Sequence, residues 1–275
     1  MRLTICLPAV FTFLSVLPLQ AAAPERLDDL MAALRFDEVA QVIALEGAGY
    51  GDTLRDEMFP RGDAARWGDL VARIYDPDRM AQMMQEQLSD HLADQDLAPM
   101  IAFYGSEPAR QIVELELAAR RALLDDAVDD AADARLAEMQ GRDDPRLKQL
   151  DRMIEGNAMV ERNVVGAMNA NFAFYRGLVA GGITPELDEA DMLRQIWAGE
   201  ELLREDTAQW LYSFLVLAYD PVSDADLDTY IDFALTDTGR MLDAALYDSF
   251  EVLFSTISNQ LGLGAAQFLQ LGDEL

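Results

Sequence analysis

Two segments of this chain align without a gap at an offset of 130 residues, and this repeat constrains the fold more than any other feature. DQDLAPMIAFYGSEPAR, residues 94–110, lies over DADLDTYIDFALTDTGR, residues 224–240. Six of the seventeen aligned positions are identical, namely Asp94/Asp224, Asp96/Asp226, Leu97/Leu227, Ile101/Ile231, Phe103/Phe233 and Arg110/Arg240. The same offset also pairs Trp67 with Trp197. An ungapped alignment of this length indicates an internal duplication, so we expect both copies to fold alike.

Each copy predicts two helices that meet at a polar corner. Ser223 precedes a helix of the second copy and is placed to cap the backbone amide of Asp226. Ser106 and Thr236 stand where the following helix needs an N-cap oxygen. We therefore interpret FYGSEPAR, residues 103–110, as a helical corner and not as a catalytic loop.

The rest of the chain also favours helix. Apolar residues recur at helical spacing after Pro24, and no stretch alternates apolar and polar residues as a strand does. We predict an all-α fold, a helical bundle built from two related helix-corner-helix repeats behind a cleavable signal peptide. GRDDPR, residues 141–146, marks the boundary between the repeats, which are expected at 24–141 and 142–275.

Three segments carry specific structural expectations. EGAGYGD, residues 46–52, predicts a flexible connection between helices, because a phosphate-binding loop would need a strand before it. Residues 111–139 predict one helix with an apolar face and an acidic stripe. Residues 153–179 are apolar on more than one side, which is typical of a buried central helix. Asparagines 163, 169 and 171 on that helix are expected to bond to neighbouring helices, with a polar pocket as the alternative.

The N-terminus resembles a secretory signal peptide. Residues 1–23 have one basic residue, an apolar run and an alanine cluster at 21–23, and two prolines in the run argue against a membrane anchor. The single cysteine, Cys6, lies inside this segment, so cleavage would leave no thiol for disulfides or metal ligation. We expect a soluble protein that is periplasmic or secreted, with no integral membrane segment after cleavage.

Charge restricts the partners. The chain has 21 basic and 50 acidic residues, a net charge of −29, which repels nucleic acid and attracts cations. The partner expected from the sequence is a basic or neutral protein or peptide. The acidic stripe of Asp126, Asp129, Asp130 and Asp133 is interpreted as a solvated face, because carboxylates along one helix do not wrap around an ion.

The repeated motif resembles a known family. An acid-Leu pair, then Ile-x-Phe-Tyr-x-Ser and a Pro-x-Gly entry into a long helix, is similar to DUF2059, a family of exported bacterial helical proteins with no established activity. The matching residues are Asp96, Leu97, Phe103, Tyr104 and Ser106 in the first copy, and Asp226, Leu227, Phe233, Thr236 and Gly239 in the second. The copies depart from the pattern at Pro108, Ala109, Ala234 and Asp237. The resemblance implies a helical, exported protein and structural motif residues, and it supplies no catalytic residue.

No motif assigns chemistry. His91 is the single histidine, and its place near a predicted helix end favours capping over a general base paired with Asp90 or Asp94. Hydrolase, metallopeptidase and nucleotide-binding signatures are absent from the sequence. We therefore predict no catalytic, cofactor-binding or metal-binding residues and no cofactor. The favoured hypothesis is a non-enzymatic interaction or accessory protein of the cell envelope. A periplasmic carboxylate-dependent hydrolase and an acidic divalent-cation-binding protein are the alternatives.

Overall fold

The computed structural model describes residues 24–183 and 188–273, and every regular element in these ranges is a helix, which confirms the predicted all-α fold. The helices are α1 (Pro24–Ala33), α2 (Phe36–Met58), α3 (Ala64–Ile74), α4 (Pro77–His91), α5 (Ala98–Tyr104), α6 (Ala109–Ala122), α7 (Asp126–Gly141), α8 (Pro145–Gly156), α9 (Met159–Ala180), α10 (Glu189–Ala198), α11 (Glu200–Tyr219), α12 (Asp224–Ala234) and α13 (Asp237–Asp273). The predicted signal peptide, residues 1–23, lies outside the described residues.

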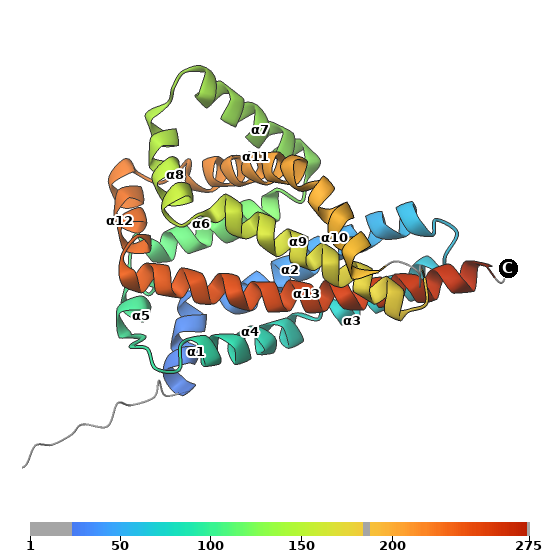
Figure 1. The fold of residues 1–275 in the computed structure, drawn as a ribbon. Coiled ribbons are helices and arrows are strands. Elements are labelled where there is room, and N and C mark those ends of the chain that lie inside the picture. The colour runs from blue at the N-terminus through green and yellow to red at the C-terminus, as the bar shows by residue number, and fades with distance from the viewer. Residues whose placement is uncertain (1–23, 184–187, 274–275) are drawn as a thin grey trace, which may run out of the picture.

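The long helix α13 crosses the whole molecule, and α9 lies beside it in the same direction (Figure 1). Successive residues of α9 contact successive residues of α13, so the two helices are parallel. The side chain of Asn163 donates to the Tyr247 hydroxyl at 3.1 Å, and that of Asn169 donates to a Glu251 carboxylate oxygen at 2.8 Å. Two of the three asparagines noted in the sequence thus form the expected hydrogen bonds between helices.

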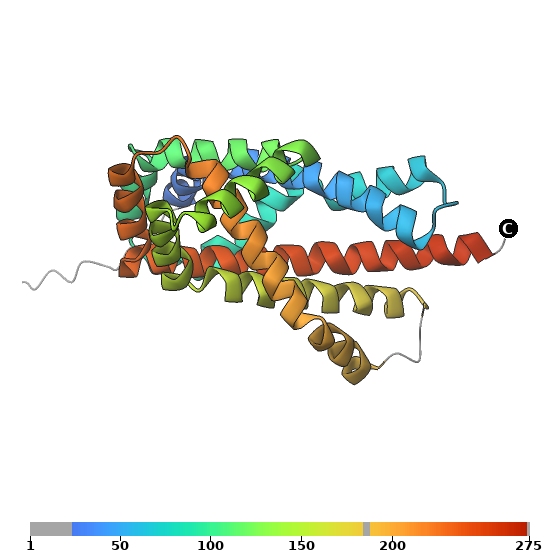
Figure 2. The ribbon, with the colours of Figure 1, turned by 90° about the horizontal axis from the view of Figure 1, so that it is seen from above.

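Further helices pack on both sides of this pair. α3 and α4 contact α13, and α11 contacts α6, α7 and α9. The C-terminal part of α13 packs in an aromatic cluster. There the Trp67 ring contacts the rings of Phe59 and Phe268 edge to face, with centroid distances of 4.9 and 5.2 Å. Figure 2 shows α10 and the start of α11 (gold) at the edge of the assembly, where α10 packs on α9.

The two corners meet at one end of the molecule, where α5 and α12 lie (Figure 1). The rings of Phe103 and Phe233 stack with a centroid distance of 3.7 Å and an interplanar angle of 9°. Both rings are half-buried and not fully buried, because each covers the other while one edge of the pair faces solvent. The aligned Leu97 and Leu227 are both buried. Trp67 and Trp197 differ, with 1% and 63% of their surfaces exposed.

Capping differs between the two corners. The Thr236 hydroxyl accepts from the Gly239 amide at 3.1 Å, which confirms the N-cap predicted for α13. Ser223 likewise accepts from the Asp226 amide at 3.2 Å. The prediction for Ser106 is wrong, because none of the described amides of α6 donates to its hydroxyl, although that hydroxyl donates to the Phe103 carbonyl at 3.1 Å as Thr236 does to the Phe233 carbonyl. In the first corner a Glu107 carboxylate accepts an amide of α6 instead.

The surroundings of Gly239 explain why the motif has a glycine at this position. A Cβ atom at this position would lie 2.2 Å from the Phe233 carbonyl oxygen and 2.8 Å from the Ala234 Cα atom. Such distances are far inside van der Waals contact, so a larger residue would push α13 away from α12. The glycine therefore allows the tight second corner.

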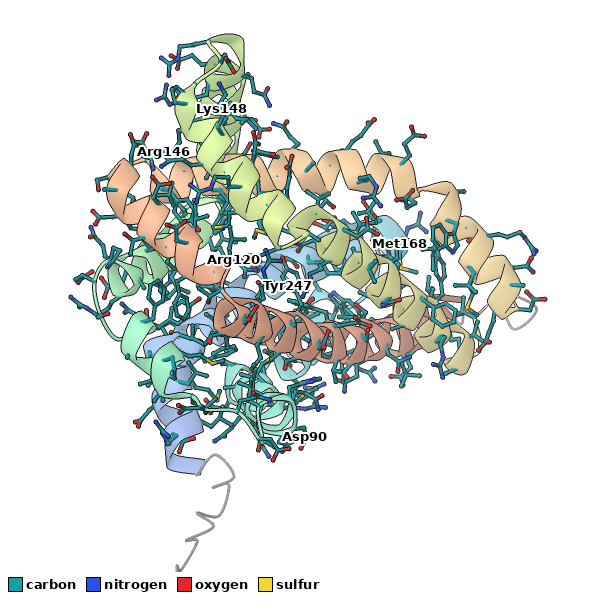
Figure 3. All side chains as sticks on the ribbon, turned by 60° about the vertical axis from the view of Figure 1, so that its left-hand side comes forward. Asp90, Arg120, Arg146, Lys148, Met168 and Tyr247 are labelled. Atoms are coloured by element: carbon teal, nitrogen blue, oxygen red, sulfur yellow. The ribbon has the colours of Figure 1, made fainter. Side chains whose placement is uncertain are left out.

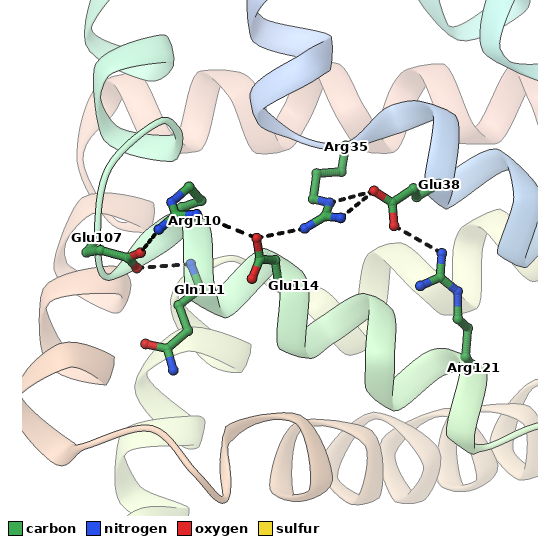
Figure 4. A network of polar contacts seen from close by, with 7 residues as sticks. All are labelled: Arg35, Glu38, Glu107, Arg110, Gln111, Glu114 and Arg121. Carbon is green, nitrogen blue, oxygen red and sulfur yellow. Dashed lines mark hydrogen bonds and ion pairs between the residues drawn. The ribbon is translucent and has the colours of Figure 1, made fainter.

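Ion pairs tie the first corner to the α1–α2 junction (Figure 4). Arg35 lies between these helices with φ of 55°, and its guanidinium pairs with Glu114 at 2.8 Å and with Glu38. Arg121 extends the network to Glu38 at 3.2 Å, and Arg110 pairs with Glu107. Exposed pairs of this kind contribute little singly, so the network fixes orientation more than it adds stability.

The glycine-rich segment is not a connection between helices, as the sequence predicted, but lies inside α2. A Cβ at Gly47 would lie 2.3 Å from the Tyr75 ring, and the Gly51 carbonyl accepts from the Trp67 indole at 2.7 Å. Glycine is needed here for close contact between α2 and the α3 region, and tertiary packing outweighs its low helix propensity.

Two long helices predicted from the sequence are each divided. Residues 111–139 break at Leu123–Asp125, where the Asp125 side chain caps α7 by accepting from the Ala127 amide at 3.0 Å. Residues 153–179 break at Ala158, which has φ of 50°. The prediction that this helix is buried is also wrong. Only Val164, Gly177 and Leu178 of α9 are buried, because one side of the helix borders an open cleft.

One hydrophobic core joins residues from both sides of the boundary predicted at 141/142. Leu136 from before the boundary and Leu150, Leu227 and Leu261 from after it belong to the same buried cluster. α11, from after the boundary, also contacts α6 and α7 from before it. The two sequence repeats thus share a core in the folded chain.

Candidate functional site

A large open cleft lies among α6, α9, α11 and α13, and residues of α2, α5, α8 and α12 also line it. Its volume is about 1010 Å³, at the upper end of the range of small-molecule sites. Its lining residues on α13 run from Gly239 to Ser258, a span of roughly 28 Å at the α-helical rise. Figure 3 places Tyr247 and Arg120, which both line the cleft, near the centre of the helical assembly. Asp90 and Lys148 lie at its periphery (Figure 3).

The end of the cleft near α5 and α12 holds a carboxylate among tyrosines. Glu116 of α6 accepts a hydrogen bond from the Tyr219 hydroxyl at 2.6 Å and a longer one from the Tyr230 hydroxyl at 3.3 Å. Both bonds go to Oε1, so among the described residues Oε2 has no partner. Tyr104, the tyrosine of the first motif copy, packs edge to face on Tyr230 at 6.2 Å.

Burial sets the electrostatics of this cluster. Removal from water raises the pKa of Glu116 above its ordinary value, and the hydroxyls of Tyr219 and Tyr230 partly oppose that rise. Burial and then the neighbouring Glu116 carboxylate raise the pKa values of both tyrosines. The tyrosines therefore remain hydroxyl donors at neutral pH, and no basic side chain pairs with Glu116 within the described ranges.

A second acid lines the same cleft from α13. Burial raises the pKa of Asp243 to about 6, although Arg162 and Arg240 oppose the shift. The Arg162 guanidinium lies 3.8 Å from the Asp243 carboxylate and 5.2 Å from the centre of the Tyr247 ring. Arg162 is thus engaged by a carboxylate and by an aromatic face.

The other cation that lines the cleft is also paired. Arg120 forms a two-pronged ion pair with Glu46, with nitrogen to oxygen distances of 2.9 and 2.7 Å. Against these two arginines the lining contains five acids, Glu116, Glu161, Asp243, Asp248 and Glu251. Among the described residues, the lining of the cleft therefore has an excess of negative charge.

An amide oxygen without a partner adds to the excess of acceptors. Asn157, at the turn between α8 and α9, lines the cleft and has only 7% of its surface exposed. Its Oδ1 atom is buried and has no hydrogen-bond partner in the described part of the chain. Buried acceptors of this kind are usually satisfied, so the site is short of donors.

Further along, the cleft is mainly apolar. The rings of Trp210 and Phe214 stack in parallel at 5.4 Å on the α11 side, and Phe250 and Phe254 stack at 5.9 Å on the α13 side. Val165 and neighbouring small residues of α9 complete this part. An occupant would therefore have an apolar body beside Trp210 and the phenylalanines and a polar group beside Glu116.

The sequence-predicted motif residues are divided between the corner and the cleft. Only Tyr104 and Gly239 line the cleft. Asp96 accepts from the Ala98 amide of α5 at 3.0 Å, whereas Ser106 is exposed and does not cap α6. The remaining motif residues form the packed or capped parts of the corners, namely Leu97, Phe103, Asp226, Leu227, Phe233 and Thr236.

Sequence reasoning missed Glu116 and Asp243. A signal for Glu116 was present, because it stands four residues after Ile112 and three after Val113, on the apolar face of its helix. An acid at such a position is forced into the interior and needs partners. Its tyrosine partners lie more than 100 residues away, so the cluster itself has no local signature.

The other residues considered for chemistry are not in the cleft. His91 is exposed at the end of α4. Within residues 24–183 and 188–273, no group of three or more ligating side chains is placed to hold a metal ion. Over the same ranges, no helix is both long enough and apolar enough to cross a membrane.

Comparison with known proteins places the first corner in a family. Residues 78–138, from α4 to α7, match the family model described as an uncharacterized protein conserved in bacteria, DUF2059. The chain carries a DUF2059 segment. This segment contains Tyr104 and Glu116, and it confirms the resemblance seen in the sequence. The second copy lies outside the match, so the duplication stays a prediction. No curated protein and no solved structure matches the chain significantly.

Proposed function

We propose that this protein is exported to the periplasm or secreted and acts there without catalysis, by binding a largely apolar ligand in the cleft. The observation that carries the proposal is the cleft itself, with its stacked aromatic walls and one polar end. Sites with this distribution of apolar and convergent polar groups are typical of small-molecule binding. The protein or peptide partner expected from the sequence stays a prediction.

An apolar ligand fits this cleft better than a folded partner. Peptide groups placed against the aromatic walls would lose their hydrogen bonds to water, at a cost of about 1–3 kcal/mol each. A hydrocarbon body loses nothing there and gains about 25 cal/mol per Å² of buried apolar surface. The apolar part of the cleft therefore selects for hydrocarbon.

A glycine in the wall permits a sharp test. Gly166 of α9 lines the cleft, and a Cβ added there meets no atom within 4 Å, so Gly166→Trp should place an indole in the cleft without a clash at its Cβ atom. Gly68 of α3 is equally open but lies outside the cleft, so Gly68→Trp is the matched control. We expect decan-1-ol, titrated calorimetrically, to bind the native protein and the control but not the Gly166 variant. Equal binding to both variants would contradict the proposal.

One observation favours a second function. Glu116 and Asp243 line one cleft and burial raises the pKa of each, and carboxyl groups with shifted pKa values in a cleft are candidates for proton transfer. If the protein is a hydrolase that uses these two carboxyl groups, both Glu116→Gln and Asp243→Asn should lose all turnover. Hydrolysis of a chromogenic ester or glycoside by the native protein, absent from both variants, would support it over simple binding.

A further inference from the structure

We propose that the polar end of the cleft is a binding site for a primary ammonium group, so that the ligand is a cationic amphiphile with its amine on Glu116. This inference rests on the proposed function, since it names the chemistry of the ligand in that cleft. It adds the residue that receives the charged group and the sign of that charge.

The first step is the unmet demand for donors. Glu116 Oε2 and the buried Asn157 Oδ1 are acceptors without a partner among the described residues, and both side chains line the cleft. The two lining arginines are already paired, Arg120 with Glu46 and Arg162 with Asp243. An occupant that displaces water from these acceptors must replace its hydrogen bonds, and an ammonium supplies three donors.

The second step is charge. The five lining acids outnumber the two lining arginines, and the whole chain carries a net charge of −29. An anionic head group would meet this field at the rim and the Glu116 carboxylate at the end of the cleft. A neutral alcohol would gain a hydrogen bond but no ion pair. Of the three kinds of head group, only a cation is attracted both at the rim of the cleft and by the Glu116 carboxylate.

The third step is the surroundings of Glu116. Three tyrosines, Tyr104, Tyr219 and Tyr230, pack around it with at most 8% of each exposed. A cation beside aromatic rings gains further attraction from their electron-rich faces. Burial that raises the pKa of Glu116 also strengthens its pairing with a cation that enters the same site.

Matched ligands test the head group. Decylamine has the length of decan-1-ol and an amine like that of lysine, which is protonated at pH 7. We expect decylamine to bind the native protein about ten- to a hundredfold more tightly than decan-1-ol, the range for a hydrogen bond to a charged group. Equal affinities would overturn the proposal, and this comparison needs no variant.

Variants then locate the site. Glu116→Gln keeps an acceptor for Tyr219 and should lose the preference for decylamine while still binding decan-1-ol. Glu205→Gln removes the same charge from an exposed position outside the cleft and should keep the preference. Loss of preference in both variants would mean attraction by net charge alone and would overturn the ammonium site. If decan-1-ol fails to bind the native protein, the proposed function fails instead.

Discussion

The buried carboxyl of Asp243 makes a quantitative prediction about stability and pH. Its pKa is raised from 3.8 to about 6, mainly by burial, with Arg162 and Arg240 opposing the shift. A difference of about two pKa units corresponds to about 3 kcal/mol between the protonated and ionised forms. We treat this as an upper limit, because a quarter of the side chain remains exposed.

The sign follows from linkage. Below pH 3.8 the carboxyl is protonated in both the folded and the unfolded chain and has no effect on stability. As the pH rises from 3.8 to about 6, the unfolded chain releases its proton first, so the free energy of unfolding falls. Above about pH 6 the carboxylate is ionised in both states, and the full cost of burying its charge lowers the free energy of unfolding. Asp243→Asn should therefore stabilise the protein at pH 7, relative to its effect at pH 3.5, by up to about 3 kcal/mol.

Urea unfolding followed by circular dichroism at pH 3.5, 5 and 7 measures this difference. Asp206→Asn is the control, since Asp206 is exposed on α11 and forms no hydrogen bond or ion pair among the described residues. The stability of the Asp243 variant relative to native protein should rise with pH, whereas that of the control should not. A pH-independent difference for Asp243→Asn would refute the burial of its charge.

Two further predictions concern packing. Phe103→Ala should reduce the free energy of unfolding by about 2 kcal/mol, less than for a fully buried ring, and a double-mutant cycle with Phe233→Ala should give a coupling of about 1 kcal/mol. Coupling near zero in urea unfolding would mean that the corners do not stack. Gly47→Ala should be less stable than Gly49→Ala by on the order of 2 kcal/mol, because only the first Cβ meets the Tyr75 ring. Equal melting temperatures would contradict the close helix contact.

Local signals in the sequence predicted much of the fold. Helical spacing and the absence of alternation indicated an all-α chain, and Ser223 and Thr236 cap helices where their positions indicated. These features depend on residues within one or two turns of each other, which a sequence displays directly. The paired corners were also visible as a repeat, although the stacking of Phe103 on Phe233 required the fold.

The errors arose where distant packing outweighs local preference. The glycines of α2 were interpreted as a break because glycine is a poor helix former, yet Tyr75 and Val71 occupy the space that Gly47 and Gly51 leave. Ser106 was assigned as a cap from its position, but Glu107 has the longer reach and takes that role.

The cleft was the least predictable feature. Its walls come from helices at both ends of the chain, and the partners of Glu116 are distant in sequence. With 50 acidic residues, no single acid stands out by composition. Only the place of Glu116 on an apolar helix face distinguishes it from the solvated acids.

Photolabelling tests the central claim, that the cleft is the ligand site, most directly. A decylamine derivative with a diazirine at the end of its chain would be irradiated with the protein, and the labelled residues identified by mass spectrometry. We expect labels on the apolar walls, at Trp210, Phe214, Phe250 or Phe254, and their loss in Gly166→Trp. Competing apolar side chains outside the cleft are the exposed Leu193, Trp197 and Leu202 on α10 and α11. Labels confined to that group, with the cleft unlabelled, would contradict the account.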